Sequence, residues 1–490
     1  MPATNEFTTT RSELLTEQLD MAWNEWIHGN EIRAAEIWYF VRGQAEDSQD
    51  RFSEIDALTN LAMFQRVWEG KNFSNKQIDL NRNLDNARAL HYHKGIVNAL
   101  LELAQSTNLP EIAQASFKEA REIAETQLTE GEKKKILKNV IFRHGRRAIQ
   151  RGESRFDSIF KEFQKALEYA IEENDKYYIA QIHHGIGECF LRLGNLKEAR
   201  RNYEIALQIF EYLGNERKIL EVLVSITDVE SQLVSLSDEG EKPIDVLAKY
   251  YGDFETLLKA NENKIPLSDR FEHLSRFCDL FLELGDLDQV TILISELERI
   301  LRQANIESSQ SFDFKSLPWG RMAIAGDKGN LELTKLNLAR AEELYNYILR
   351  RKNRARISDL YGALISLAII SIYRYRIYFD ITFLSTAQDL IEEAIQITKD
   401  TDHLRGYVRA SMVSAMLKIT LEGETDFSEI EQVLETAQKE GLHIEARRAQ
   451  EEINRFNRVA RLRHDNRTKD RSVAEVLYYA LEAKKIVRKA

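Results

Sequence analysis

Residues 180–215, AQIHHGIGECFLRLGNLKEARRNYEIALQIFEYLGN, constrain the fold of this chain more than any other segment. In the first half, Ile182, Ile186 and Phe190 recur at helical spacing, which places them on one face of an α-helix. Gly194 follows, and glycine readily takes the left-handed conformation that ends a helix and reverses the chain. This half therefore predicts a helix with one buried face that ends in a tight turn.

The second half of the segment has a helical period of its own. Its inner side carries small residues where two helices must approach closely, and one large ring fills the remaining space. These positions are Ala199, Tyr203, Ala206 and Ile209, and Gly214 closes the unit. The segment thus predicts two helices packed as a hairpin.

At these positions the segment resembles the tetratricopeptide repeat, a unit of about 34 residues with Gly, Ala and aromatic positions at fixed intervals. The positions in register are Gly187, Phe190, Gly194, Ala199, Tyr203 and Ala206. His183 stands where the family usually has tryptophan, and the proline that often ends the second helix is absent near Glu211. The resemblance implies an all-α fold, an α-α superhelix (solenoid) of stacked helical hairpins.

Weaker copies of the pattern flank this unit. Gly29, Ala34 and Trp38 repeat its spacing near the N-terminus, and Gly285 ends a later copy of its first helix. For Trp23 and Trp26 we predict packing at an end of the array, with ligand stacking as the alternative. Several copies that share one spacing favour an array over a single isolated motif.

The copies divide the chain into four predicted segments. Residues 1–302 form an N-terminal helical array, and residues 331–446 form a C-terminal one. Between them, residues 303–330 are predicted to be an irregular loop or boundary, because SSQSFDFKSLPWG and AGDKGN interrupt the helical period. Its aromatic residues, Phe312, Phe314 and Trp319, leave a functional loop open as an alternative. Residues 447–490 are predicted to be a basic helical tail.

The amino-acid composition favours long helices and a charged, solvated surface. The 490 residues include only 5 prolines and 21 glycines, with 43% hydrophobic and 30% charged residues. The two cysteines, Cys189 and Cys278, lie on apolar helix faces, so we expect buried free thiols in a reducing cytoplasm.

Neither a membrane nor a nucleic acid is the partner that the sequence favours. The N-terminal residues show no basic segment followed by an apolar core, so we expect no signal peptide. The most apolar run, 360–373, is shorter than the roughly 20 residues needed to cross a bilayer, and we expect a buried central helix there. The formal net charge of −11 argues against nucleic acid as the default partner. We expect a cytoplasmic protein.

No catalytic constellation is found in the sequence. It contains no phosphate-binding glycine loop, HExxH, G-x-S-x-G or paired CxxC motif. Adjacent histidines such as His183 and His184 point about 100° apart on a helix and cannot readily bind one ion together. We therefore expect no enzyme activity, no cofactor and no metal.

The resemblance implies that the first helix of each hairpin lines a concave groove. Carried onto matching positions, it predicts partner-binding residues in three units, and the alternative is an ordinary solvated face. They are Gln181, His184, Glu188 and Arg192; Asn98, Glu102 and Gln105; and Glu272, Ser275, Asp279 and Glu283. A polar groove of this kind suits an extended peptide or a partner helix.

Three functions stay open from the sequence. The first is a scaffold or adaptor for a protein or peptide partner, and the second is a peptide-responsive regulatory sensor of the bacterial tetratricopeptide type. The third, a minor alternative, is nucleic-acid binding through a basic patch. Its residues would be Lys133, Lys134, Lys135, Arg143, Arg146, Arg147, Arg458, Arg461 and Arg463. The partner's identity and the oligomeric state are not encoded in any readable pattern.

Overall fold

The computed structural model describes most of the chain. The described residues are 12–68, 74–107, 109–151, 156–235, 242–310, 320–352, 355–401, 404–422 and 428–439, with 446, 449–450 and 453–454. Within them lie twenty α-helices, a short 3-10 helix (Glu262–Lys264) and no strand. The predicted all-α fold is confirmed.

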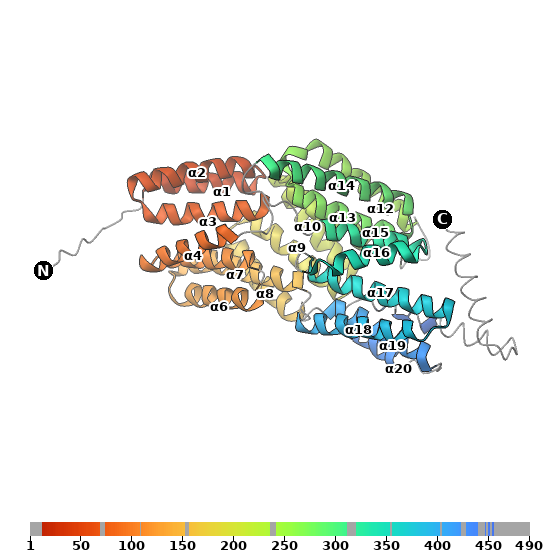
Figure 1. Cartoon of the computed structure of the whole chain (residues 1–490). Coiled ribbons are helices and arrows are strands. Elements are labelled where there is room, and N and C mark those ends of the chain that lie inside the picture. Colours follow the sequence, from red (N-terminus) through yellow and green to blue (C-terminus); the bar gives the residue numbers. More distant parts are fainter. Residues whose placement is uncertain are drawn as a thin grey trace.

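The helices follow one another as ten antiparallel pairs, each an odd-numbered helix and the next even-numbered one (Figure 1). Their bounds are α1 (Glu13–Ile27), α2 (Glu31–Ser48), α3 (Arg51–Trp68), α4 (Ser74–Ala89), α5 (His93–Ser106), α6 (Pro110–Thr126), α7 (Glu130–Arg151), α8 (Phe156–Glu172), α9 (Lys176–Arg192), α10 (Leu196–Leu213), α11 (Glu216–Ser235), α12 (Pro243–Ala260), α13 (Leu267–Leu284), α14 (Leu287–Gln310), α15 (Gly320–Thr334), α16 (Leu338–Leu349), α17 (Ile357–Tyr378), α18 (Thr382–Asp400), α19 (Leu404–Glu422) and α20 (Ser428–Lys439).

The hairpin α9/α10 shows why the local sequence folds in this way. Asp175 and Asn195 cap the two helices, each accepting a hydrogen bond from a backbone N–H one turn on. Gly194 reverses the chain at φ +73°, and Gly214 ends α10 at φ +66°. In the interior, Ile182 is fully buried, as predicted.

One aromatic position organises the packing within several hairpins. It lies on the second helix and is nearly fully buried in each; its occupants are Trp38, Phe117, Phe163, Tyr203 and Tyr345. In three of these hairpins a glycine of the first helix faces the ring, so that the two helix backbones approach closely. This shared register confirms the tetratricopeptide-like helical repeat.

Gly187 and Gly252 should respond in opposite ways to alanine. A Cβ at Gly187 would lie 2.5 Å from Cε1 of Tyr203, so Gly187→Ala should destabilise the protein by roughly 1–3 kcal/mol through overpacking. Gly252 is exposed in α12 and an added methyl group would meet no atom there, so Gly252→Ala should stabilise by up to about 1 kcal/mol. Urea denaturation followed by circular dichroism measures both. Equal effects at the two sites would contradict the packing role of Gly187.

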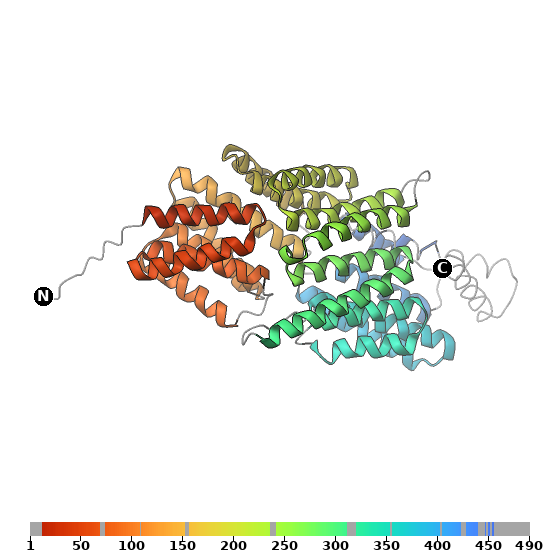
Figure 2. The same cartoon turned by 90° about the horizontal axis from the view of Figure 1, so that it is seen from above.

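The odd-numbered helices form one layer of the array. Consecutive odd-numbered helices contact one another from α1 to α19, whereas consecutive even-numbered helices stand further apart. The stack therefore curves with its odd-numbered helices inside, and Figure 2 shows the helices winding from the N-terminal group to the C-terminal group. We call the surface of the odd-numbered helices the inner face.

The first superhelical turn closes on itself. The Asn215 side-chain amide donates to the carbonyl oxygen of Ile27 at 3.0 Å, and the Ser268 hydroxyl donates to the carbonyl oxygen of Val67 at 3.4 Å. Gly29, at φ +78°, lies so close to Asn215 that a Cβ would be 3.3 Å from its Cα. The N-terminal helices α1–α3 thus contact the turn between α10 and α11, α11 itself and α13, although these segments are far apart in the sequence.

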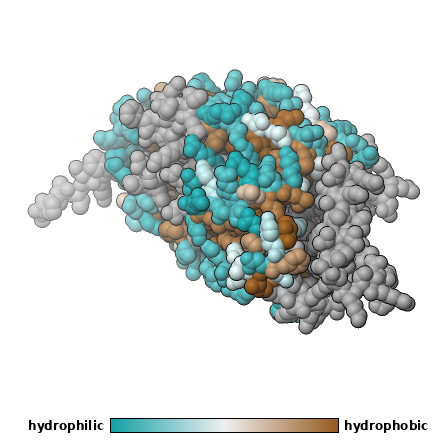
Figure 3. Space-filling view, turned by 45° about the vertical axis from the view of Figure 1, so that its right-hand side comes forward, coloured by the Kyte–Doolittle hydropathy of each residue, from teal (hydrophilic) through white to brown (hydrophobic). Residues whose placement is uncertain are grey.

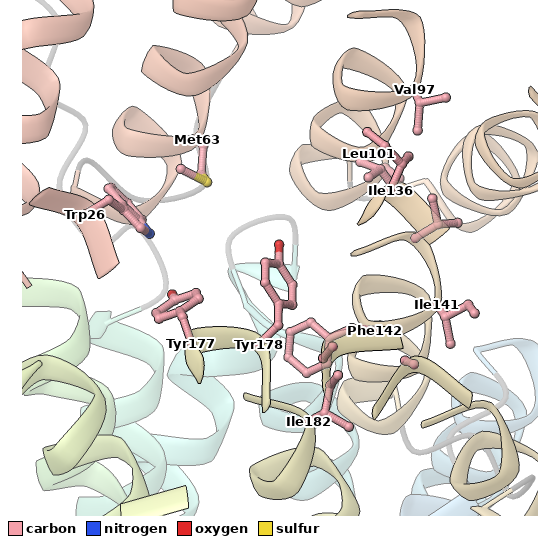
Figure 4. Close-up of a cluster of buried hydrophobic side chains, with 14 of the residues drawn as sticks. Trp26, Met63, Val97, Leu101, Ile136, Ile141, Phe142, Tyr177, Tyr178 and Ile182 are labelled. Atoms are coloured by element: carbon pink, nitrogen blue, oxygen red, sulfur yellow. The ribbon is translucent and has the colours of Figure 1, made fainter. Parts of the chain in front are cut away.

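Aromatic side chains fill the space inside this closed turn. The Trp26 and Trp38 ring centroids are 5.6 Å apart with the rings tilted by 39°, and Trp23 meets Tyr177 of α9 edge to face at 6.3 Å. Figure 4 shows Trp26 and Tyr177 on facing elements of one buried cluster that also includes Met63 and Tyr178. The prediction that these tryptophans pack at an end of the array is confirmed, since both lie on α1, the first helix. Closure of the turn places Trp23 against α9 as well.

One segment differs from the sequence-based expectation, and two others cannot be compared with it. The AGDKGN segment lies within α15, where Gly329 faces the ring of Tyr345. Gly329 therefore serves helix packing, and the segment does not interrupt the helix. Residues 311–319, with Phe312, Phe314 and Trp319, lie outside the described residues, as does most of the tail 447–490.

The apolar helix α17 is 22 residues long, which exceeds the predicted run. By length and composition its segment Ile357–Tyr375 could cross a membrane, and half of that window is buried inside the protein. Its buried residues pack against α18 and α19 in the C-terminal core. Large apolar residues are exposed where α17 turns into α18. Figure 3 shows apolar residues interspersed with polar ones on the face that it presents.

Candidate functional site

Predicted site residues on α5, α9 and α13 meet charged side chains of neighbouring odd-numbered helices. Glu102 of α5 is 1% exposed and lies between two arginines. Its Oε1 accepts from Nε of Arg66 at 2.5 Å, and its Oε2 accepts from Nη1 of Arg143 at 3.2 Å. Gln105 donates to the Arg143 carbonyl oxygen at 3.1 Å. These contacts join α3, α5 and α7.

The centre of the inner face is a second charged cluster. Arg146 of α7 forms ion pairs with Glu188 of α9 and, at 3.0 Å, with Glu221 of α11. Lys218 lies 2.6 Å from Glu221. Burial alone would raise the pKa of Glu221, but the charges of Lys218 and Arg146 hold it well below its usual value. Glu221 is therefore ionised at neutral pH.

His184 lies beneath this cluster. Its ring is 2% exposed, with Nε2 at 2.9 Å from the Ser225 hydroxyl and Nδ1 at 3.7 Å from Glu221. Burial lowers the pKa of His184 to about 4 in spite of the nearby carboxylates, so the ring is neutral at pH 7. Gln181, also buried, donates to the Tyr177 hydroxyl at 3.0 Å. Both side chains are therefore buried below the inner face and are hydrogen-bonded to other residues of the protein.

The predicted residues of α13 belong to a more acidic region. The Ser275 hydroxyl lies 3.5 Å from Oδ2 of Asp327 in α15. Burial, and then the charge of Asp279, raise the pKa of Asp327 well above its ordinary value, against the opposing effect of Arg356. The inner face at α13 and α15 therefore brings two carboxyl groups, Asp279 and Asp327, near each other, whereas the clusters on α5 to α11 pair carboxylates with arginines or lysines.

The remaining predicted groove residues vary in exposure. Asn98 and Arg192 are half-buried, and Glu272 is exposed. The Glu283 side chain lies outside the described residues.

The structure divides the predicted basic patch into two groups. Lys133 and Lys134, near the start of α7, pair with Glu130 and Glu172, and Lys135 is exposed. The arginines Arg143, Arg146 and Arg147 are half-buried on the inner face, where Arg147 donates to the Thr107 carbonyl oxygen at 2.7 Å. Arg458, Arg461 and Arg463 lie outside the described residues. A single continuous basic surface does not arise from the described part of α7.

Sequence reasoning missed several charged residues of the inner face. They are Arg66 on α3, Lys218, Glu221 and Asp228 on α11, Arg276 on α13 and Asp327 on α15. Arg276 and Asp228 form an ion pair between α11 and α13. The apolar residues of α11 recur at the same helical spacing as those of α9. Selecting the equivalent polar positions of α11 would therefore have identified Glu221 and Asp228.

Two further features bear on possible ligands. An open hollow of about 420 Å³ lies at the closure of the first turn, lined by residues that include Glu31, Trp68 and Lys264. It lies apart from the predicted groove residues. Within the described part of the chain, no group of three or more His, Cys, Asp or Glu side chains is placed to hold a metal.

Comparison with known proteins finds likeness in structure. No protein-family model matches the sequence, and no curated protein matches it. A solved structure of a Rap protein complexed with Competence and Sporulation Factor is similar with a TM-score of 0.46 at 12% identity; the match covers 84% of this chain and 99% of that one.

Two more solved structures are similar to the chain. One is a signal transduction ATPase with a tetratricopeptide repeat sensor from Pyrococcus horikoshii, with a TM-score of 0.34, 16% identity, and coverage of 83% of this chain and 52% of that one. The other is yeast Tom70, with a TM-score of 0.31, 12% identity, and coverage of 92% and 97%.

Proposed function

We propose that this tetratricopeptide-like helical repeat protein is a non-enzymatic scaffold or adaptor that holds a protein or peptide partner on its inner face. The observation that carries the proposal is the row of charged side chains from α3 to α13, each fixed by a partner on a neighbouring helix. Side chains ordered before binding lose little conformational entropy when a partner arrives. The inner face is therefore preorganised for recognition.

The chemistry of the row favours a polypeptide partner. Carboxylates and guanidinium groups alternate along it, so that a bound segment could find both hydrogen-bond donors and acceptors at short intervals. Extended peptides and amphipathic helices present groups of both kinds over such lengths. A cytoplasmic location, where such partners are abundant, is part of the proposal.

Charge reversal at Arg192 tests this function. Arg192→Glu should remove the dominant protein that co-purifies with the tagged chain from its own cells, and should weaken binding of that purified partner at least tenfold. The control is Arg201→Glu, because Arg201 lies on α10 with a side chain that is 72% exposed. Retention of the partner by Arg192→Glu, or equal loss with both variants, would contradict binding on the inner face.

A peptide-responsive sensor is the second candidate, favoured by the closure of the first turn. Polar contacts join α1–α3 to the turn between α10 and α11, to α11 and to α13, among them Asn215 to Ile27 and Arg217 to Glu31. A ligand on the inner face that changed the curvature of the stack would strain these contacts and alter the surface offered by α1–α3. A change in small-angle scattering on addition of a bound short peptide would support the sensor over a static scaffold.

A further inference from the structure

Two arginines on the inner face share one carboxylate. Arg66 of α3 donates to Glu102 through Nε at 2.5 Å and through Nη2 at 3.3 Å, and Arg143 of α7 donates to the same carboxylate through Nη1 at 3.2 Å. Glu102 is 1% exposed, whereas the side chains of Arg66 and Arg143 are 21% and 19% exposed. The group therefore carries a net positive charge, and its cations are accessible to a ligand.

A third guanidinium group lies beside this pair. Arg147, one turn after Arg143 on α7, is half-buried and donates to the main-chain carbonyl oxygens of Gln105 and Thr107, at 3.5 and 2.7 Å. A guanidinium has five N–H donors, and the hydrogen bonds from Arg66 to Glu102 use two of them. The three side chains can therefore donate to a further acceptor without giving up the contacts that hold them in place.

The next cluster along the inner face is balanced. Its two cations, Arg146 and Lys218, pair with two carboxylates, Glu188 and Glu221. A nucleic acid that crossed the arginines of α3 and α7 would carry further phosphates over these carboxylates, which would repel it. A single acidic group on a chain of mixed charge matches this face better.

We propose that Arg66, Arg143 and Arg147 form a subsite for an acidic side chain of the bound polypeptide, whose carboxylate accepts N–H groups from these guanidinium groups. The three arginines are half-buried, so the attraction is stronger than in an ion pair at the exposed surface. The subsite rests on the proposed function and adds which partner the inner face selects: a segment with an aspartate or glutamate that lies over α3–α7.

A selected peptide tests the subsite. A displayed library of random peptides is selected on the full-length chain, and one selected peptide is synthesised with a fluorophore for anisotropy titrations. Its aspartates and glutamates are then replaced one at a time by asparagine and glutamine. We expect one of these changes to weaken binding to the wild-type chain about tenfold, the effect of losing a charged hydrogen bond.

Arg66→Gln identifies the residue that binds this acidic side chain. The variant should bind the unchanged peptide about tenfold more weakly, and the critical amide change in the peptide should then weaken binding less than about twofold further, because both changes remove the same interaction. Glu102 keeps its ion pair with Arg143, so we expect a folded chain, which thermal melting checks. The matched control is Arg51→Gln on the same helix, because Arg51 is 54% exposed and pairs with Glu54. It should change affinity less than about twofold.

The outcomes separate the subsite from the proposed function. Peptides in which no acidic residue matters, or amide changes with the same effect on the wild-type chain and on Arg66→Gln, would overturn the subsite and leave the scaffold intact. A single-stranded oligothymidine that displaces the peptide and binds more tightly than it does would assign the arginines to nucleic acid, which also overturns the subsite. A library that yields no peptide bound by the folded chain would overturn both.

Discussion

Replacing Arg217 with methionine should lower the free energy of unfolding by about 3–5 kcal/mol and open the first superhelical turn. Arg217 lies 2.9 Å from Glu31 of α2 and 2.5 Å from Asp269 of α13, and its side chain is 13% exposed. Methionine retains the length of the aliphatic stem but leaves both carboxylates without this cation. Glu31 is 2% exposed, so its unpaired charge cannot be solvated without separating the helices.

Chemical denaturation measures the loss of stability, and small-angle scattering measures the accompanying increase in radius of gyration. Arg201→Met is the control, since its side chain is 72% exposed and its carboxylate partner Glu198 is 3.9 Å away. Adding Glu31→Gln to Arg217→Met should restore part of the stability, because it removes the stranded charge. A radius unchanged in Arg217→Met would show that the turn does not depend on this pair.

The hairpins could be predicted because their signals are local. Gly194 takes φ +73° and ends α9 where the turn was expected, and Tyr203 is fully buried at the position where the repeat places its large ring. Both features depend on residues within one hairpin. Helical periodicity reports such short-range packing directly.

Closure of the first turn could not be predicted from the same signals. Asn215 resembles an ordinary turn residue in the sequence, yet its amide binds the Ile27 carbonyl, 188 positions away. Contacts of this kind depend on the accumulated curvature of several hairpins, which small rotations in each one determine. The total curvature is therefore not determined by any single residue.

In the candidate site, too, features within one helix could be predicted and contacts between helices could not. The helical register of α9 correctly predicted that Glu188 and His184 lie on the first helix of a hairpin. The burial of His184 and the ion pair between Glu188 and Arg146 could not be predicted in this way, because they depend on the neighbouring helices α7 and α11. The arginines of α7 suggested an external basic patch because their partners are distant in sequence; Arg143 and Glu102 are 41 positions apart. Partner binding by these residues stays a prediction.

Lowering the pH from 7 to 4 should reduce the free energy of unfolding by about 3 kcal/mol through His184 alone. An unfolded histidine has a pKa near 6.5, whereas burial holds the pKa of native His184 at about 4. Between these values the unfolded state binds a proton that the native state does not. The contribution of His184 is therefore complete above pH 6.5 and is lost as the pH falls toward 4.

The measurement is a set of urea denaturation curves between pH 7 and pH 5, above the range in which ordinary carboxylates titrate. Over this interval the free energy of unfolding of the wild-type protein should fall by about 2 kcal/mol through His184. His184→Gln should remove most of this pH dependence while keeping a polar side chain near Ser225. His183, whose pKa is also lowered by burial, and Asp327, whose pKa is raised by burial, remain in both proteins and contribute to the residual slope. Parallel profiles for the two proteins would show that His184 is protonated equally in the folded and unfolded states, and that it does not stay neutral beneath the charged cluster.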